Sequence, residues 1–241
     1  MSNLISALVL AGGLGTRLRS VVSELPKPMA AIRGRPFLEH LLDYWIYQGV
    51  NHFVLSVGYL HQLIIDHLGA NYKGAKIDYV IEETPLGTGG GLLLGAQKIG
   101  QDKPFLVLNG DTYFAVNLDK LILFSANHKS DWCFSLFAAN EVGRYMGMDI
   151  SPEGFITSLK SVTTHSGRLA NGGVYWVQPS ALQQIKFLPG DKCSLEEDIF
   201  PTAIGLGQRM MGIEFPGLFI DIGVPIDYQR ASEMLPLEFT L

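Results

Sequence analysis

Residues 10–18, which read LAGGLGTRL, have the types and spacing needed to hold a phosphate chain. Their glycines let backbone N–H groups approach phosphate oxygens with no Cβ in the way. Arg17 can grip phosphate with its planar guanidinium, and Lys27, which lies between two prolines, can act as a point charge. The pattern predicts a phosphate-binding turn. The alternative is a tight β–α turn without a ligand, in which case Lys27 would be an ordinary solvated lysine.

Two aspartates each follow an apolar run. Asp111 ends an Asn-Gly-Asp triplet after residues 105–108, and Asp221 follows residues 218–220. A carboxylate at the end of a buried strand must be paired, must cap a turn or must bind a metal ion. Mg²⁺ typically takes one or two carboxylates together with substrate phosphates. Because a phosphate-binding turn is also present, the two aspartates favour a Mg²⁺ site over simple capping.

The elements that must position these residues alternate along the first half of the chain. Apolar runs predict strands over residues 5–10, 52–57, 77–81 and 105–108, and helical spacing predicts helices over residues 35–48, 60–68 and 88–98. This alternation is typical of a parallel sheet covered by helices on both faces. Such sheets bind ligands at the carboxyl ends of their strands, where the glycine turn and Asp111 both fall.

The second half of the chain follows a different pattern. After a helix over residues 119–128, short strands are expected over residues 132–138, 147–150, 155–159, 174–177 and 210–214, with helices over residues 195–204 and 225–234. These strands predict mixed or antiparallel additions to the sheet. We expect a single domain over residues 1–241, whose N-terminal half binds nucleotide and whose C-terminal half binds the second substrate.

Composition excludes several classes of protein. Hydrophobic residues make up 47% of the chain and charged residues 17%, a balance that excludes disorder. The net charge of −5 argues against a nucleic-acid partner, which would select a basic surface. No apolar run is long enough to span a membrane, and no secretory signal is expected. With two cysteines, the chain is predicted to be cytoplasmic and free of disulfides.

The glycine turn differs from two common nucleotide-binding motifs. A dinucleotide fingerprint, G-x-G-x-x-G, lacks its third glycine because Leu18 stands in that place, which argues against an NAD-binding oxidoreductase. A P-loop requires a lysine directly after its last glycine, and the turn has none at that spacing.

The chain resembles instead the sugar-1-phosphate nucleotidylyltransferases, the enzymes that make nucleotide-diphosphate sugars. The resemblance covers nearly the whole chain, through residues 10–18, 26–29, 82–90, 109–111, 171–175 and 219–225. It implies a Rossmann-like three-layer α/β sandwich with a mostly parallel central sheet. It also implies in-line attack of a sugar 1-phosphate on the α-phosphorus of a nucleoside triphosphate, with loss of pyrophosphate. Such chemistry depends on positioning and charge neutralisation.

The resemblance further implies roles for individual residues. Arg17 and Lys27 would be catalytic, and Asp111 and Asp221 would hold Mg²⁺. The residues implied in nucleotide binding are Leu10, Ala11, Gly12, Gly13, Gly15, Thr16, Glu82, Gly87 and Thr88. Those implied in binding the sugar phosphate are Gly147, Asn171, Gly173, Glu196 and Lys160. The alternative for Glu196 is the exposed first turn of a helix capped by Ser194.

One stretch departs from the family pattern. Many relatives hold the sugar phosphate with a Glu-Lys pair in the strand before the Asn-Gly-Gly loop. Here that stretch, residues 158–162, reads SLKSV, so the pair is not intact and Lys160 would act from a shifted position.

The resemblance implies that the loop after residue 81 holds the base, with Glu82 or Glu83 at its edge and Gly87 beneath it. The alternative is that the glutamate simply faces water. A carboxylate only accepts hydrogen bonds, and guanine offers two adjacent N–H donors where uracil or thymine offers one, so GTP is favoured. Within the family, the motifs look most similar to guanylyltransferases that act on D-glycero-α-D-manno-heptose 1-phosphate. The alternatives are a mannose-1-phosphate guanylyltransferase and a hexose-1-phosphate uridylyl- or thymidylyltransferase.

A protein of another class, a catalytically silent nucleotide-sugar sensor of the same fold, is the further alternative. Such a protein would be expected to lose charged site residues, whereas this chain keeps Arg17 and Lys27 together with both aspartates. A homo-oligomer is also possible, with Phe37, Trp45 and residues 235–239 as candidates for the subunit contact.

Overall fold

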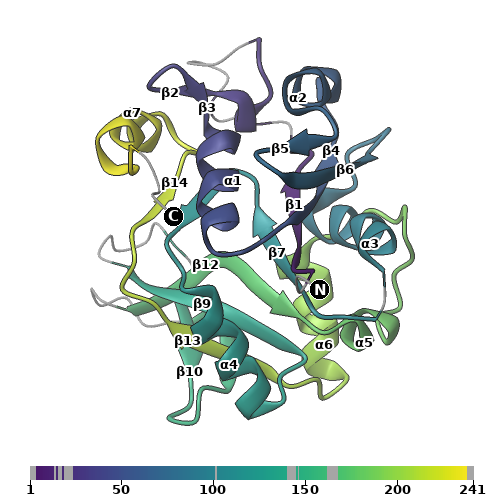
Figure 1. Cartoon of the computed structure of the whole chain (residues 1–241). Coiled ribbons are helices and arrows are strands. Elements are labelled where there is room, and N and C mark those ends of the chain that lie inside the picture. Colours follow the sequence, from purple (N-terminus) through teal and green to yellow (C-terminus); the bar gives the residue numbers. More distant parts are fainter. Residues whose placement is uncertain are drawn as a thin grey trace.

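The computed structural model is built around a sheet that begins with the four predicted parallel strands (Figure 1). β1 (Ser6–Ala11) lies between β4 (His52–Val57) and β7 (Phe105–Asn109), and β6 (Ala75–Ile81) lies beyond β4. The carboxyl ends of these strands therefore meet at one edge, as the alternating pattern predicts. The structure describes residues 4–13, 15, 18, 24–100, 102–139, 145, 147–161 and 168–237.

Further strands extend this sheet beyond β7, which confirms the expected additions. β12 (Arg168–Val177) pairs antiparallel with β7 and with β9 (Trp132–Ala139), and β13 (Met210–Glu214) pairs parallel with β9. At the start of β12 the sheet continues through two more antiparallel strands. At the opposite edge of the sheet, a further antiparallel strand pairs with β6. The bounds of these strands are β10 (Gly147–Ile150), β11 (Ile156–Ser161) and β5 (Asn71–Tyr72).

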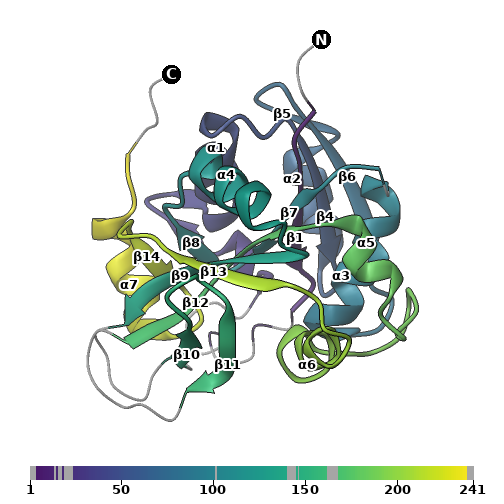
Figure 2. The same cartoon turned by 90° about the horizontal axis from the view of Figure 1, so that it is seen from below.

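Helices cover both faces of the sheet, which confirms the three-layer arrangement. In Figure 2, α3, α5 and α6 gather at the right, away from α1, α4 and α7. Alternation along β1 explains the two layers, since Ala7 and Val9 pack into one core and Leu8 packs into the other. On the first face lie α1 (Phe37–Tyr47), α2 (His61–Leu68), α4 (Leu118–His128) and α7 (Pro225–Met234). On the second lie α3 (Gly87–Ile99), α5 (Pro179–Gln183), the π-helical turn η3 (Leu195–Ile199) and α6 (Phe200–Gly205).

Two predicted helices differ from the structure by more than one residue at an end or in their continuity. The helix expected over residues 35–48 begins only at Phe37, because Pro36 keeps an extended backbone, with φ −52° and ψ 139°. The helix expected over residues 195–204 is divided into η3 and α6. Pro201 lies at this division, and a proline lacks the backbone N–H that a continuous α-helix would use there.

Two short pairs of strands stand outside the main sheet. β2 (Ala31–Ile32) and β3 (Arg35–Pro36) form a hairpin after the 3₁₀ turn η2 (Lys27–Met29). β8 (Thr112–Phe114) follows β7 and pairs antiparallel with β14 (Phe219–Asp221). Strands this short carry no periodic signal, and of the four only β14 is marked in the sequence, by the apolar run before Asp221. They matter because β14 ends at Asp221 and the β2–β3 hairpin follows Lys27.

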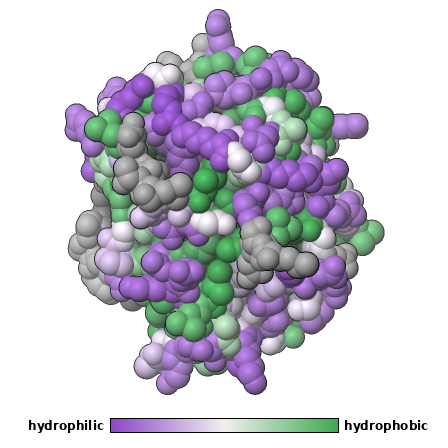
Figure 3. All heavy atoms as spheres, in the orientation of Figure 1, coloured by the Kyte–Doolittle hydropathy of each residue, from purple (hydrophilic) through white to green (hydrophobic). Residues whose placement is uncertain are grey.

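The exposed surface corrects one expectation about subunit contacts. Phe37 and Trp45 are fully buried in the core, so neither is available to a second subunit, whereas Leu237 is 74% exposed. Figure 3 shows a mostly hydrophilic face with small apolar groups and a narrow apolar band below its middle. Within the described part of the chain, no helix combines the length and the apolar character needed to cross a bilayer.

Candidate active site

Lys27 lies between the two aspartates that the sequence predicts as metal ligands. Its Nζ is 2.5 Å from Oδ2 of Asp111 and 3.6 Å from Oδ1 of Asp221. The lysine side chain is 11% exposed, whereas the side chains of Asp111 and Asp221 are 39% and 37% exposed. The two carboxylates therefore share one cation and still keep surface that a substrate can reach.

The pairing of β14 with β8 brings the two aspartates together. The register sets Asp221 beside the start of β8, and the backbone N–H of Ile222 donates to the carbonyl oxygen of Asp111 over 3.0 Å. The N–H of Gly223 donates to Oδ1 of Asp221 over 2.6 Å. A Cβ on Gly223 would lie 2.8 Å from that oxygen and 2.9 Å from Nζ of Lys27, so a side chain there would displace the carboxylate or the ammonium.

The carboxylate pair suits a divalent cation. Burial and the Asp111 carboxylate raise the pKa of Asp221, while Lys27 and the N–H of Gly223 favour its charged form. Positive charge between the carboxylates therefore relieves their repulsion. Among the residues that the structure describes, no group of three or more His, Cys, Asp or Glu side chains gathers at a metal position. Two carboxylates would leave the remaining positions of Mg²⁺ to water and substrate phosphates, which that ion accepts readily.

A cavity of about 300 Å³ opens beside the carboxylates and the glycine turn. The N–H of Gly110 donates to the Leu10 carbonyl over 2.9 Å, and Gly15 has a left-handed φ of 58° and packs against Lys27. The turn and the lysine therefore share one hollow, as phosphate binding requires. The cavity is lined by Leu10, Ala11, Gly13, Gly15, Lys27, Pro28, Gly110, Asp111, Asp221 and Gly223. Thr16 and Arg17 lie outside the described residues.

Glu82 points under the glycine turn from the end of β6. Its Oε1 accepts a hydrogen bond from Oγ of Ser56 over 2.8 Å, and its Oε2 accepts one from the N–H of Leu86 over 3.1 Å. The carboxylate lies so close to Gly12 that a Cβ there would collide with it. Each carboxylate oxygen retains a further acceptor position. Glu83, the other candidate at this loop, is exposed.

A segment from the second half of the chain covers the start of α3. The N–H groups of Gly89 and Gly90 donate to the carbonyl oxygen of Cys193 over 3.0 and 3.1 Å. The N–H of Cys193 donates in turn to the carbonyl of Leu86 over 2.9 Å. Gly87 has a φ of 78°, and a Cβ there would lie 2.6 Å from the Cys193 oxygen. The predicted base loop is thus fastened to the segment before η3.

Thr88 and Glu196 join these two segments through their side chains. Oγ1 of Thr88 accepts from the N–H of Leu195 over 2.9 Å and donates to Oε2 of Glu196 over 3.1 Å. Oγ of Ser194 donates to the same carboxylate oxygen over 2.9 Å and accepts from the N–H groups of Glu196 and Glu197. The capping alternative is therefore present in the structure, and two hydroxyls also hold the Glu196 carboxylate.

Asn171, Gly173 and Gly147 lie close together on β12 and β10. Nδ2 of Asn171 donates to the hydroxyl of Tyr175 over 2.8 Å, and the N–H of Gly173 donates to Oδ1 of Asn171 over 3.1 Å. Gly147 pairs with the residue that precedes Asn171. Burial and the nearby Glu196 carboxylate raise the pKa of Tyr175, the residue whose hydroxyl Asn171 contacts.

Lys160 lies on the edge strand β11, where the next residue, Ser161, pairs with Gly147 of β10. Its Nζ is 2.9 Å from Oε1 of Glu197, and its side chain is 56% exposed. The ion pair links β11 to the turn that carries Glu196.

Sequence reasoning missed Ser56 and Gly223. Ser56 is fully buried in the apolar strand β4, where a hydroxyl needs a partner, and the Glu82 carboxylate provides one. A single serine within an apolar run is the signal that could have found it. Gly223 follows Asp221 at a spacing that allows the N–H to reach the carboxylate, and the Asp-x-Gly sequence is its signal.

Known proteins are similar to this chain in sequence and in fold. The heptose enzyme "D-glycero-alpha-D-manno-heptose 1-phosphate guanylyltransferase" of Aneurinibacillus thermoaerophilus is 38% identical over 96% of this chain and 98% of its own length. The enzyme of the same name from Campylobacter jejuni is 35% identical over 93% of this chain and 97% of its own length. A crystal structure of HddC from Yersinia pseudotuberculosis complexed with GMP-PN is 36% identical, with a TM-score of 0.82 over 95% of this chain and 99% of HddC.

The family model described as nucleotidyl transferase matches residues 6–236, nearly the whole chain. The glycine turn, the lysine and the paired aspartates all lie within the matched residues. The chain is therefore an enzyme of the nucleotidyl transferase family.

Proposed function

We propose that the protein transfers the guanylyl group of GTP to D-glycero-α-D-manno-heptose 1-phosphate and releases pyrophosphate. The observation behind this proposal is the meeting of Lys27, Asp111 and Asp221 at one cavity beside the glycine turn. The two enzymes that match almost end to end carry this activity in their names, which supports both the base and the acceptor.

The phosphates of GTP would lie along the glycine turn. A Cβ on Gly13 would meet no atom of the described residues within 4 Å, so none of those residues covers the backbone there. The acceptor is a phosphate that is already ionised, so its attack on the α-phosphorus requires no general base. Lys27, with Arg17 by resemblance to the family, would neutralise the charge that develops on the leaving pyrophosphate.

Asp111 and Asp221 would hold Mg²⁺. The Lys27 ammonium supports this assignment, since it is a cation already placed within reach of both carboxylates. When bound, Mg²⁺ would supply positive charge to the phosphates and fix their orientation. The protein contributes the spacing of the carboxylates, which the pairing of β8 with β14 sets and for which Gly223 leaves room.

Glu82 would read the base. Ser56 and the N–H of Leu86 orient its carboxylate, and each oxygen keeps an acceptor position for a second donor. The adjacent N1–H and N2–H groups of guanine match these two oxygens. Uracil and thymine offer one N–H at this edge and would leave one oxygen without that bond.

The second half of the domain over residues 1–241 would bind the sugar phosphate. The residues proposed for this role are Gly147, Asn171, Gly173, Glu196 and Lys160. Glu196 can accept from sugar hydroxyls, and Lys160 offers a cation to the phosphate in place of the altered Glu-Lys pair. The contact of Lys160 with Glu197 supports this role, because it places the Lys160 ammonium beside the turn that carries Glu196.

A cytoplasmic location fits these substrates and the two described cysteines, which are free and buried. A homo-oligomer stays a prediction. Phe37 and Trp45 are no longer candidates for its subunit contact, because both are buried in the core.

The test is pyrophosphate release with Mg²⁺ in a panel that crosses GTP, UTP, dTTP and ATP with heptose, mannose and glucose 1-phosphates. We expect turnover with GTP and the heptose phosphate. Turnover with another pair would support the same reaction but assign it to a different nucleotide or sugar phosphate. Absence of turnover with every pair, together with tight GTP binding, would favour the silent sensor.

A further inference from the structure

Lys27 and Asp221 belong to segments that the main sheet does not hold directly. The β2–β3 hairpin follows Lys27, and among the described strands β2 and β3 pair with each other alone. Asp221 ends β14, whose partner in the described part of the chain is β8 alone. An isolated pair of short strands is marginally stable in water. Other contacts must therefore fix the position of the lysine relative to the aspartate.

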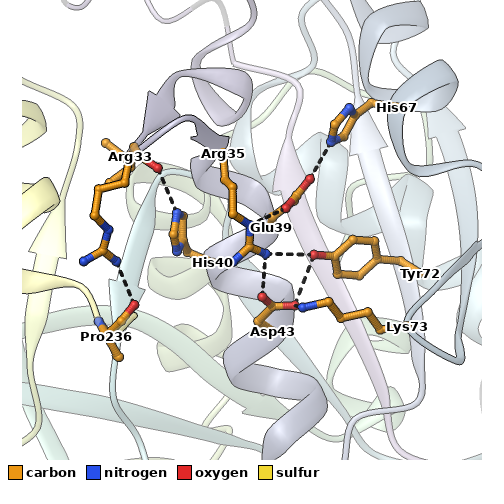
Figure 4. Close-up of polar contacts among 10 residues, drawn as sticks. Arg33, Arg35, Glu39, His40, Asp43, His67, Tyr72, Lys73 and Pro236 are labelled. Atoms are coloured by element: carbon orange, nitrogen blue, oxygen red, sulfur yellow. Dashed lines mark hydrogen bonds and ion pairs between the residues drawn. The ribbon is translucent and has the colours of Figure 1, made fainter. Parts of the chain in front are cut away.

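Arg33, at the tip of the hairpin, supplies such contacts. Its guanidinium donates to three carbonyl oxygens at the end of α7, those of Ser232 (3.3 Å), Leu235 (2.9 Å) and Pro236 (2.7 Å). Carbonyls at the last turn of a helix lack partners within the helix and carry partial negative charge, so they suit an arginine. Figure 4 shows Arg33 reaching toward Pro236, on the side of the hairpin away from the cluster around Arg35.

The backbone at Arg33 is unusual for this side chain. Its φ is 51° and that of Gly34 is 78°, which are the values of a two-residue hairpin turn that favours Asn-Gly. A non-glycine residue in this region costs about 1 kcal/mol. The three bonds to α7 give a physical reason for an arginine at this position.

A second bond ties the same elements nearer to the site. The hydroxyl of Tyr228, on α7, donates to the carbonyl of Ala31, on β2, over 2.8 Å. The α7 helix begins at Pro225, and Val224 alone separates it from Gly223. The contacts therefore close a ring that runs from Lys27 through the hairpin, α7 and β14 to Asp221, whose carboxylate meets Lys27 again.

We propose that Arg33 is a positioning residue, which clamps α7 to the hairpin and so sets Lys27 against Asp221 for catalysis. This role rests on the proposed function of that site. Arg33 itself lies on the surface and contacts backbone carbonyls, so it acts through the two segments that it joins. Loss of the clamp is expected to loosen both segments, including β14, which is remote from Arg33 in sequence.

Arg35→Ala is the matched control for Arg33→Ala. Arg35 lies in the same hairpin and makes bonds of similar length, but to Glu39 (2.7 Å), Asp43 (2.6 Å) and Tyr72 (3.2 Å), none of which is on α7 (Figure 4). Its removal weakens the contact of the hairpin with α1 and leaves the ring intact. A general loss of hairpin stability would affect both variants, whereas loss of the clamp would affect only Arg33→Ala.

The experiment combines backbone hydrogen exchange of the ligand-free proteins with steady-state kinetics. For Arg33→Ala we expect faster exchange in residues 27–36 and also in 219–224, a fall in kcat of about tenfold, and a change in the KM for GTP below about twofold. Arg33→Lys should recover part of kcat, and Arg35→Ala should leave residues 219–224 and kcat unchanged.

Unchanged exchange in residues 219–224 of Arg33→Ala would overturn the clamp, whatever the activity. Equal losses of kcat in Arg33→Ala and Arg35→Ala would overturn it too. If Arg33→Ala does not fold, Tyr228→Phe takes its place, with a smaller change in the same direction expected and no change counting against the proposal. If the wild type lacks guanylyltransfer, the proposed function fails while the exchange comparison still decides the clamp.

Discussion

Glu82 and Ser56 lie at the ends of adjacent strands of the main sheet, whereas Lys27 and Asp221 lie on segments outside it. On the base side, parallel register between β4 and β6 fixes the serine beside the glutamate, and Ser56 is fully buried. On the metal side, the partners come from a 3₁₀ turn and a short strand and meet across side-chain contacts. The difference teaches that the residues proposed to read the base are held by the sheet, while those proposed for the phosphate chemistry depend on contacts between segments outside it.

Lys27→Ala is the largest expected disruption of the metal side. It removes the cation that Asp111 and Asp221 share, so kcat should fall by about 10³ while the ratio of GTP to UTP use stays the same. Measurement is by pyrophosphate release, with circular dichroism to show that the variant is folded. Lys76→Ala is the control, because Lys76 pairs with Asp78 at the other end of the sheet and should leave the rate unchanged. A Lys27→Ala enzyme within tenfold of wild type would contradict the assignment.

Glu82→Gln should disrupt the base side instead. The amide keeps the size of the side chain but offers only one acceptor oxygen, so the preference for GTP over UTP should fall by about 10- to 100-fold. With saturating GTP, kcat should change much less. The ratio of kcat/KM for the two nucleotides is the measurement, and Glu83→Gln, at the exposed neighbour, is the control. An unchanged ratio in Glu82→Gln would remove Glu82 from base recognition.

The smallest expected effect concerns pH and the hairpin. Nε2 of His40 donates to the carbonyl of Ile32 over 3.1 Å, and burial is the main reason that the pKa of His40 is lowered from 6.5 (Figure 4). The unfolded chain therefore takes up a proton at a higher pH than the folded protein does. This contribution to stability is complete above pH 6.5 and is lost as the pH falls toward the lower folded-state pKa.

The measurement is the free energy of unfolding of wild type and His40→Gln between pH 7.5 and pH 5, a range of about one unit above and 1.5 units below the ordinary pKa of histidine. The glutamine amide can still donate to Ile32 but does not titrate. The wild type should lose more stability than the variant over this range. Parallel curves would show that His40 does not cause the loss.

The sequence predicts the elements of the base side better than those of the metal side. The strand over residues 52–57, which carries Ser56, has its predicted bounds, because a largely apolar run without alternation marks a strand that is buried along its whole length. β2, β3, β8 and β14 are two or three residues long, too short for any period to show. The pairing of β8 with β14 also joins segments far apart in the chain, which local pattern does not encode.

The site shows the same division. Asp111 and Asp221 can be found because each is a carboxylate at the end of an apolar run, and the structure brings them together at Lys27. Arg33 offers no such signal, since its partners are backbone carbonyls that any residue provides. Phe37 and Trp45 were misjudged for a related reason, because an aromatic side chain on a helix can face either a core or another subunit.

The bonds between Cys193 and the start of α3 also bear on how such an enzyme can evolve. Because the carbonyl of Cys193 accepts hydrogen bonds from the N–H groups of Gly89 and Gly90, the loop before Glu196 is bonded through its backbone to the turn at Gly87. Under the proposed roles, a change that reshapes the loop to admit another sugar would also shift the turn proposed to lie beneath the base. Acceptor and donor preferences are therefore expected to drift together across descendants of this chain, and a new sugar would call for compensating changes near Gly87.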